Sequence, residues 1–263
     1  MMIDASIITE FERNGYAILS NILTVEVVEA LRQIWSERYI PQHQRSFIVG
    51  NEVGYEYPGL VFPIVAGEGI LDILEALMGP QVQLDSIAIT GVPGNDGSSI
   101  SWHRDPYARL PRGTAYYYPN SVHLLVYLQD MDTNTGPLRV LPGSHRRPRC
   151  ISEETRHLPQ GGERLIAVNS GDGVLIHNQL LHSRSPNRST DPRLLFSAIY
   201  TLSCMKSTID YYHPTVAALL QELTSIGDSR LMRLMGLDDS FDQKYNCGFL
   251  SPEKELWKLW AAA

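Results

Sequence analysis

The stretch Asn134-Thr-Gly-Pro-Leu-Arg-Val-Leu-Pro-Gly-Ser-His145 encloses a short apolar segment, residues 138–141, between two groups of turn-forming residues. Glycine and proline are the strongest punctuation of regular structure, so each group marks the end of an element. A few apolar residues bounded by such turns are typical of a short strand. The stretch therefore predicts one strand held between two tight turns.

The same pattern recurs along the chain from about residue 81 to residue 203. Its spacers include Pro93-Gly94-Asn95-Asp96-Gly97 and Gly161-Gly162. Many short strands separated by turn formers favour a barrel or a double-sheet jelly roll. The other segments that we expect to be strands of this β core are residues 82–90, 99–103, 121–129, 165–168, 173–177 and 194–202.

Helical patterns flank the β core on both sides. The N-terminal part, about 1–80, predicts helices at 7–13, 24–38 and 70–78, with one strand at 16–19. The C-terminal tail, about 213–263, becomes helical again at 216–223, 228–235 and 253–260. No repeat or linker divides the sequence, so we expect a single domain over residues 1–263, mainly β with flanking helices.

The composition excludes several kinds of partner. The 263 residues include 22 Lys+Arg and 29 Asp+Glu, which gives a formal net charge of −7. Contacts to phosphates of nucleic acids or anionic membranes need clustered basic residues. The one dense basic cluster is short and consists of Arg146, Arg147 and Arg149. We therefore expect no nucleic-acid partner and no membrane partner. The composition gives no information on the oligomeric state.

Cysteine usage and the ends of the chain indicate the compartment. The three cysteines, Cys150, Cys204 and Cys247, are too few and too far apart for a disulfide framework, and no CxxC pair suggests zinc. The N-terminus has no basic segment followed by an apolar one, and no apolar run approaches the roughly 20 residues that span a bilayer. We expect a reducing, cytoplasmic location.

The sequence Trp102-His103-Arg104-Asp105 contains the candidate chemistry. Side chains two residues apart on a strand leave the same face, so His103 and Asp105 can converge on one ion, and His182 is a candidate third ligand from a later strand. Two histidines and one carboxylate are typical of non-haem Fe(II) oxygenases, but a hydrolytic zinc site also uses three protein ligands. The short motif alone is weak, because a surface histidine and a turn-capping aspartate before Pro106 give the same letters.

Further motifs surround these residues in a fixed order. They are Phe11-Glu-Arg-Asn-Gly-Tyr16 before a helix, the 134–145 stretch, Ser170-Gly-Asp-Gly-Val-Leu-Ile-His-Asn-Gln-Leu-Leu-His182, and Ser183-Arg-Ser-Pro-Asn187 followed by Arg193. This order resembles the phytanoyl-CoA dioxygenase family of Fe(II)- and 2-oxoglutarate-dependent oxygenases over most of residues 8–203. The resemblance implies a double-stranded β-helix core (jelly-roll, cupin-like) with iron at its mouth.

The resemblance also implies roles for individual residues. His103, Asp105 and His182 match the iron ligands, and Arg193 matches the arginine that pairs with the distal carboxylate of 2-oxoglutarate. A planar, permanently charged guanidinium suits that carboxylate because it can donate two hydrogen bonds at once. His177, five residues before His182, matches a structural position, so we favour His182 as the ligand.

Two arginines depart from the pattern of the family. Arg104 stands where members often have glutamine, and Arg184 stands where they often have a small residue. These departures leave open the details of cosubstrate and substrate recognition, although they do not affect the three ligands.

Several other residues are candidates for the cosubstrate and the substrate. On the strand 121–129, His123 and Leu125 share one face, where they are expected either to meet 2-oxoglutarate or to belong to the barrel wall. The segment after Asp105 is rich in tyrosines, which combine apolar area with a hydroxyl group. It predicts either a substrate lid or the start of the next strand. The candidates for contact with the substrate are Arg104, Tyr107, Tyr116 and Tyr118.

The implied activity is oxidation of a small organic molecule. The resemblance implies hydroxylation of an unactivated C–H bond with Fe(II), 2-oxoglutarate and O2, release of succinate and CO2, and stimulation by ascorbate. The retained Asp105 argues against halogenation, but desaturation, cyclisation or epoxidation by the same radical chemistry stays open. Other open hypotheses are a catalytically silent jelly-roll binding module, a metal hydrolase and a cupin-type oxygenase that needs no cosubstrate. A natural-product or metabolic intermediate is the expected substrate.

Overall fold

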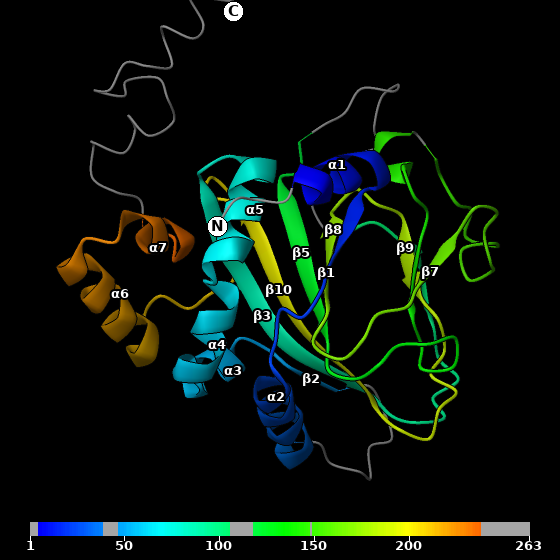
Figure 1. Cartoon of the computed structure of the whole chain (residues 1–263), viewed down its shortest axis with the longest axis horizontal. Helices are drawn as coiled ribbons and strands as arrows, with labels where there is room; N and C mark the ends of the chain where they lie inside the picture. The colour runs from blue at the N-terminus through cyan, green and yellow to red at the C-terminus, as the bar shows by residue number, and fades with distance from the viewer. Residues whose placement is uncertain (1–4, 39–46, 106–117, 148, 238–263) are drawn as a thin grey trace, which may run out of the picture.

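The computed structural model describes residues 5–38, 47–105, 118–147 and 149–237. Two antiparallel sheets face each other in these residues, and helices cover the outer face of the larger sheet (Figure 1). The elements in chain order are α1 (Ala5–Asn14), β1 (Tyr16–Leu19), α2 (Val25–Arg38), β2 (Phe47–Val49), α3 (Glu52–Glu56), α4 (Pro58–Val65), α5 (Glu68–Met78), β3 (Val82–Val92), β4 (Ile100–His103), β5 (Ser121–Tyr127), β6 (Leu138–Val140), β7 (Arg164–Ile166), β8 (Gly173–His177), β9 (His182–Arg184), β10 (Arg193–Leu202), α6 (Pro214–Ile226) and α7 (Ser229–Leu234).

The larger sheet has the strand order β1-β8-β5-β10-β3-β2, and the smaller sheet has the order β4-β9-β6-β7. Neighbours in the sheets lie far apart in the sequence, as in β1 against β8 and β4 against β9. The strand pairings of the described residues are all antiparallel. This arrangement confirms the predicted mainly β fold with a jelly-roll core.

Strands β5 and β10 show how the larger sheet separates two environments. Alternate residues of a strand point to opposite faces. Leu124 of β5 and Phe196 of β10 belong to the apolar core under the helices, whereas Leu125 and Leu195 belong to the cluster between the two sheets. Both faces are thus buried, and the inner face is the one that meets the smaller sheet.

The helices follow local signals that the sequence contains. The backbone N–H of Val27 lies 3.5 Å from Oγ1 of Thr24, at the predicted start of α2. Asp228 caps α7 by accepting from Leu231 N at 2.9 Å, and α6 ends at Gly227 with a φ of 71°. The expected helix at 253–260 lies outside the described residues.

The sequence patterns do not predict four short elements, namely β2, β9, α3 and α4. Strand β9, His182-Ser183-Arg184, contains no apolar residue, so it gives no strand signal. Its position follows instead from pairing with β4 and β6, which supply the backbone partners. This unpredicted strand presents one of the three candidate ligands.

Candidate metal centre

Successive side chains at the end of strand β4 point to opposite sides of the chain. Trp102 is buried in a small apolar cluster with Leu141 and Leu181, and its Nε1 donates to Leu158 O at 3.0 Å. His103 and Asp105 leave the chain on the other side, as the two-residue spacing predicts. Asp105 follows the strand and is held in place because its backbone N–H donates to Asn178 O at 3.0 Å.

Strand β9 brings His182 to the same place. His103 and His182 are direct partners in the antiparallel β4–β9 register, and their ring centroids lie 4.2 Å apart. One ligand atom from each of His103, Asp105 and His182 lies within 4.8 Å of the others. The structure therefore assembles the three predicted ligands into one compact cluster.

The orientation of both imidazoles suits metal binding. Nδ1 of His103 lies 2.8 Å from Ser101 O, and Nδ1 of His182 lies 3.0 Å from Leu180 O. A carbonyl can only accept, so these contacts place the proton on Nδ1 and leave the lone pair on Nε2. Fixing the tautomer through the outer nitrogen is how metal-binding histidines are generally held.

The carboxylate of Asp105 is the negative centre of the cluster. Asp105 is 8% exposed, and its Oδ2 makes no aligned hydrogen bond with the described residues. Nδ1 of His123 lies 3.2 Å from Oδ2, and Nε2 of His182 lies 3.5 Å from Oδ1. A buried carboxylate with an unsatisfied oxygen among imidazoles needs a cation, so the residues fit a divalent metal.

The burial of the cluster sets its protonation. Burial, reinforced by the nearby His103, lowers the pKa of His182 to about 3. Burial also lowers the pKa of His123, although Asp105 partly opposes this effect, and burial raises the pKa of Asp105 against the charges of His123 and His103. Neutral imidazole is the form that coordinates a metal, so His182 is ready to bind near pH 7.

Arg193 begins strand β10 on the inner face of the larger sheet. It is 4% exposed, its guanidinium carbon lies 5.3 Å from the centroid of the Tyr127 ring, and its Nη2 donates to the Tyr127 hydroxyl at 3.4 Å. Its Nε has no hydrogen-bond partner among the described residues. The geometry leaves donors of a buried cation available for an anion, as the predicted role requires.

Arg184 is a second buried guanidinium in this interior. It lies two residues beyond His182 on β9, is 6% exposed, and donates to Ser98 Oγ at 3.1 Å. Burial lowers its pKa, and the charge of Arg193 adds to that effect while Asp96 opposes it. The interior between the sheets therefore holds two arginines that influence each other. The sequence singled out Arg184 as a departure without assigning it a role.

Arg104 is a predicted substrate contact, but in the structure its hydrogen-bond partners belong to the protein. Its guanidinium donates to four backbone carbonyls, those of Gln179 at 2.7 Å, Arg149 at 3.0 Å, Ser144 at 3.0 Å and Arg147 at 3.5 Å. Because His103 and Asp105 turn toward the cluster, the side chain between them turns away from it. The geometry favours a structural role for Arg104.

The other predicted residues fall into two groups. His123 and Leu125 lie on strand β5, with His123 against Asp105 and Leu125 in the cluster between the sheets. Tyr118 lies before β5 and is 74% exposed, so it does not join the buried cluster. Tyr107 and Tyr116 lie outside the described residues.

The two remaining histidines near the cluster pack against other parts of the core. His177 ends β8 fully buried, stacks on Phe11 at 5.8 Å between ring centroids and accepts from Gln179 N at 3.0 Å. Nε2 of His145 lies 3.0 Å from Glu12 O. Neither histidine belongs to the group that converges on one point. This arrangement agrees with the preference for His182 over His177.

Tyr127 is a site residue outside the predicted set, although its position in the sequence is a usable signal. His123, Leu125 and Tyr127 alternate along β5, so the same period that places the first two on the inner face also places Tyr127 there. Its hydroxyl then meets Arg193 because β5 and β10 are neighbours in the sheet.

Comparison with known proteins identifies the family. The model of the phytanoyl-CoA dioxygenase (PhyH) family matches residues 11–195, which is more than half of the chain, so the chain belongs to this family. The predicted class, a non-haem iron and 2-oxoglutarate-dependent dioxygenase, is confirmed.

Two curated relatives illustrate the range of the family. The L-proline trans-4-hydroxylase of Streptomyces griseoviridis is 23% identical over 235 residues, which cover 76% of this chain and 86% of the relative. An ectoine dioxygenase of Nocardia farcinica is 25% identical over 150 residues, which cover 53% of this chain and half of the relative.

Solved structures confirm the fold. HygX from Streptomyces hygroscopicus, with nickel and 2-oxoglutarate bound, aligns with a TM-score of 0.65 at 16% identity, over 79% of this chain and 90% of that one. The epimerase SnoN, in complex with Fe3+, α-ketoglutarate and nogalamycin RO, aligns with a TM-score of 0.59 at 17% identity, over 82% of this chain and 88% of that one.

Among the described residues, no helix of this chain has the length and apolar character needed to cross a bilayer.

Proposed function

We propose that this protein oxidises an unactivated C–H bond of a small organic molecule, most simply by hydroxylation, and releases succinate and CO2 from 2-oxoglutarate. The observation that carries the proposal is the cluster of His103 with the buried Asp105 and His182, in which both histidine Nδ1 atoms are held by carbonyls. A metal held by two histidines and one carboxylate has coordination positions left for a cosubstrate and O2. The substrate class follows the curated relatives, which include a proline hydroxylase and ectoine dioxygenases.

Each residue of the site has a defined task in this proposal. His103 and His182 would hold Fe(II) through Nε2, and Asp105 would hold it through a carboxylate oxygen, while His123 orients that carboxylate. Bound iron would couple O2 activation to the oxidative decarboxylation of 2-oxoglutarate.

The cosubstrate would lie along the inner face of the larger sheet. Arg193 would pair with its distal carboxylate, with Tyr127 beside the guanidinium, and Leu125 would pack against its carbon chain. Apolar neighbours such as Leu195 exclude water from this space, which strengthens the pairing of the guanidinium with the carboxylate. Arg184 adds a second positive charge to the same interior.

The reaction is tested by measuring succinate with Fe(II), 2-oxoglutarate and ascorbate present. We expect succinate formation by the wild-type protein and a fall below detection in Asp105→Ala and His182→Ala, because each variant removes a metal ligand. His157→Ala, which removes an exposed histidine outside the cluster, is the matched control and should keep full turnover. Unchanged turnover in both ligand variants would overturn the proposal. Complete absence of succinate, with 2-oxoglutarate still raising thermal stability, would favour a silent binding module.

The cytoplasmic location is also part of this proposal. Cys150 and Cys204 are free and exposed in the structure. Exposed thiols persist in a reducing compartment and are oxidised elsewhere, which supports this location.

A further inference from the structure

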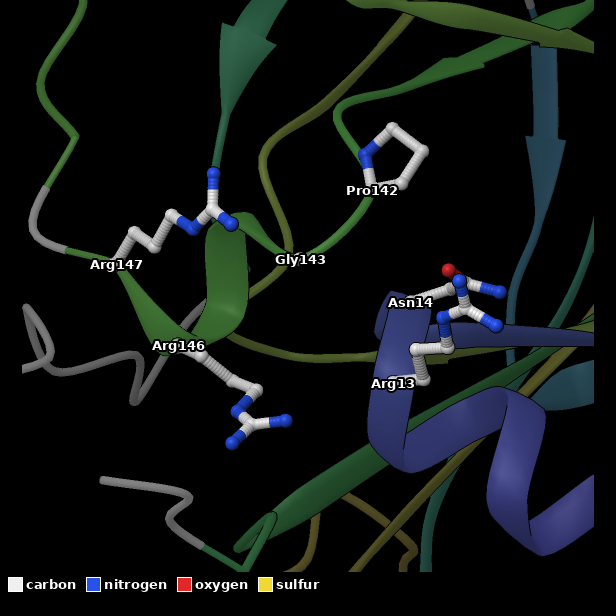
Figure 2. Close-up of a pocket in the computed structure, with 6 residues that line it drawn as sticks. All are labelled: Arg13, Asn14, Pro142, Gly143, Arg146 and Arg147. Carbon is white, nitrogen blue, oxygen red and sulfur yellow. The ribbon is translucent and has the colours of Figure 1, made fainter. Parts of the chain in front are cut away.

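A second cationic site lies outside the metal cluster, where the end of α1 meets the 3-10 helix Ser144–Arg146 (Figure 2). We call it the arginine pocket, and its lining residues are Arg13, Asn14, Pro142, Gly143, Arg146 and Arg147. Arg146 and Arg147 come from one wall, and Arg13 and Asn14 come from the opposite wall (Figure 2). The pocket has a volume of about 390 Å3, far more than the roughly 10–15 Å3 that a cavity needs to hold one water molecule.

The charge of this pocket is not compensated by the protein. Its lining contains three guanidinium groups and no carboxylate. Within the described part of the chain, Arg13, Arg146 and Arg147 form no salt bridge, unlike Arg139, which pairs with Glu163 at 2.7 Å. Three like charges around one hollow repel each other, and a bound anion removes that repulsion. In a chain with a net charge of −7, this concentration of positive charge indicates a site for an anion.

The two walls are held together before any ligand binds. Gly143 N donates to Asn14 O at 2.8 Å, and Gly143 adopts a φ of 75°, a conformation that favours glycine. Nε2 of His145 lies 3.0 Å from Glu12 O, and His145 is 1% exposed. Burial lowers the pKa of His145 to about 4, and the charges of Arg146 and Arg104 contribute, so the imidazole behind the pocket is neutral near pH 7. The arginine pocket is therefore preorganised, which lowers the cost of binding.

Hydrogen bonds connect one wall of the pocket to the segments that carry the metal ligands. Arg104, which lies between His103 and Asp105 in the sequence, donates to Ser144 O at 3.0 Å. Leu181, which precedes His182, donates its backbone N–H to Ser144 Oγ at 2.9 Å. One wall of the pocket is thus hydrogen-bonded to the segments that carry all three candidate ligands. These hydrogen bonds fix the position of the pocket relative to the metal centre.

We propose that the arginine pocket binds a phosphoryl or pyrophosphoryl group of the substrate, an inference that rests on the proposed oxidation. One carboxylate is matched by one guanidinium, as at Arg193, whereas three guanidinium groups match a ligand with several charges and several acceptor oxygens. Arginine suits phosphate because its planar fork donates two hydrogen bonds at once. The exposed side chains of Arg13 and Arg147 make the binding dependent on ionic strength.

The first arm of the test needs neither metal nor 2-oxoglutarate. Calorimetry of the metal-free protein at low ionic strength measures its affinity for inorganic pyrophosphate. We expect binding that falls about tenfold or more in Arg13→Gln and further in the double variant Arg146→Gln/Arg147→Gln, because each loses charge-assisted hydrogen bonds. Matched controls are Arg188→Gln and the double variant Arg164→Gln/Arg188→Gln, which remove exposed arginines outside the pocket and should bind like the wild type. No binding, or equal loss in variants and controls, would overturn the site.

The second arm separates a substrate group from a free phosphate ion. Succinate formation is measured with matched pairs of phosphate esters and the corresponding alcohols. We expect a preference for the esters in kcat/KM that disappears in Arg146→Gln/Arg147→Gln and persists in Arg164→Gln/Arg188→Gln. Equal kcat/KM for esters and alcohols in the wild type would assign the pocket to a free anion and overturn the substrate part. Failure of the proposed oxidation itself would abolish succinate in every variant while leaving the pyrophosphate binding of the first arm intact.

Discussion

The two faces of the larger sheet differ sharply in chemistry although the same strands build both. Along β10, the outer face presents Leu194, Phe196, Ala198 and Tyr200 to the apolar core under the helices. The inner face begins with Arg193 and faces the space that also contains His123 and Tyr127. Tyr200 brings a polar group, its hydroxyl, to that outer face, and this hydroxyl donates a hydrogen bond to Val65 O at 2.9 Å.

This difference shows how the fold separates stability from function. Apolar side chains on the outer face stabilise the sheet by burial and need no partner of a particular kind. Polar and charged side chains on the inner face are costly to bury unless a ligand or a metal completes their interactions. A substitution on one face should therefore change the stability of the protein, and a substitution on the other should change its binding.

The largest stability effect is expected on the outer face. Phe196 is fully buried there, and Phe196→Ala should lower the free energy of unfolding by about 3–5 kcal/mol because it removes packing and leaves a cavity. Urea unfolding measures this loss. At temperatures where the variant stays folded, its affinity for Fe(II) should equal that of the wild type. A large loss of Fe(II) affinity in the folded variant would break the separation of the two faces.

On the inner face, Arg193→Met should weaken 2-oxoglutarate binding roughly 100-fold while changing stability little. The variant keeps a long side chain but loses two charge-assisted hydrogen bonds to the distal carboxylate. Anaerobic calorimetry with metal present measures the affinity. The matched control is Arg139→Met, since Arg139 pairs with Glu163 instead. Equal affinities in the wild type and Arg193→Met would remove Arg193 from the cosubstrate site.

A smaller effect is expected at His123, which contacts the cluster without belonging to the three ligands. His123→Phe keeps a ring on β5 but removes the nitrogen 3.2 Å from Asp105 Oδ2. Partners that orient a metal ligand typically contribute about 10- to 100-fold to metal affinity, and we expect a loss at the lower end of that range. Competition with a chelator measures it. Unchanged Fe(II) affinity would make His123 a packing residue of the barrel wall.

A pH-dependent effect on stability concerns His145, a histidine that packs rather than binds. Burial lowers its pKa in the folded protein to about 4 from 6.5, so the folded state binds fewer protons than the unfolded state. The contribution of His145 to the free energy of unfolding is constant above pH 6.5. It falls by up to about 1.4 kcal/mol per pH unit as the pH decreases from 6.5 toward 4. Urea unfolding at pH 7.5 and 5.0 should show a smaller pH effect in His145→Gln than in the wild type. An identical pH effect in both proteins would contradict the buried, neutral state of His145.

Local patterns predicted the features that depend on one strand at a time. The spacing of His103 and Asp105, the inward row of His123 and Leu125, and the bounding turns of β6 all follow from a period of two and from turn residues. The resemblance to a family added Arg193 and the choice of His182 over His177, which periodicity alone did not give.

Features that depend on packing between distant segments have no signal in the local sequence. Strand β9 forms because β4 and β6 flank it, although its own residues are polar. Arg104 donates to backbone carbonyls of the 3-10 helix and loop around Ser144 and of Gln179, which no local pattern relates to it. The arginine pocket combines Arg13 with the basic cluster at 146–147, which the sequence shows only as a short run of charge.

The most direct test of the account is the stoichiometry of Fe(II) binding, measured by anaerobic equilibrium dialysis. We predict one Fe(II) per chain for the wild type, for His157→Ala and for Phe196→Ala under folding conditions. Asp105→Ala and His182→Ala should bind none at the same concentration, while circular dichroism shows that both remain folded. Full binding by these two variants, or no binding by the wild type, would contradict the assignment of the His103, Asp105 and His182 cluster as the metal centre.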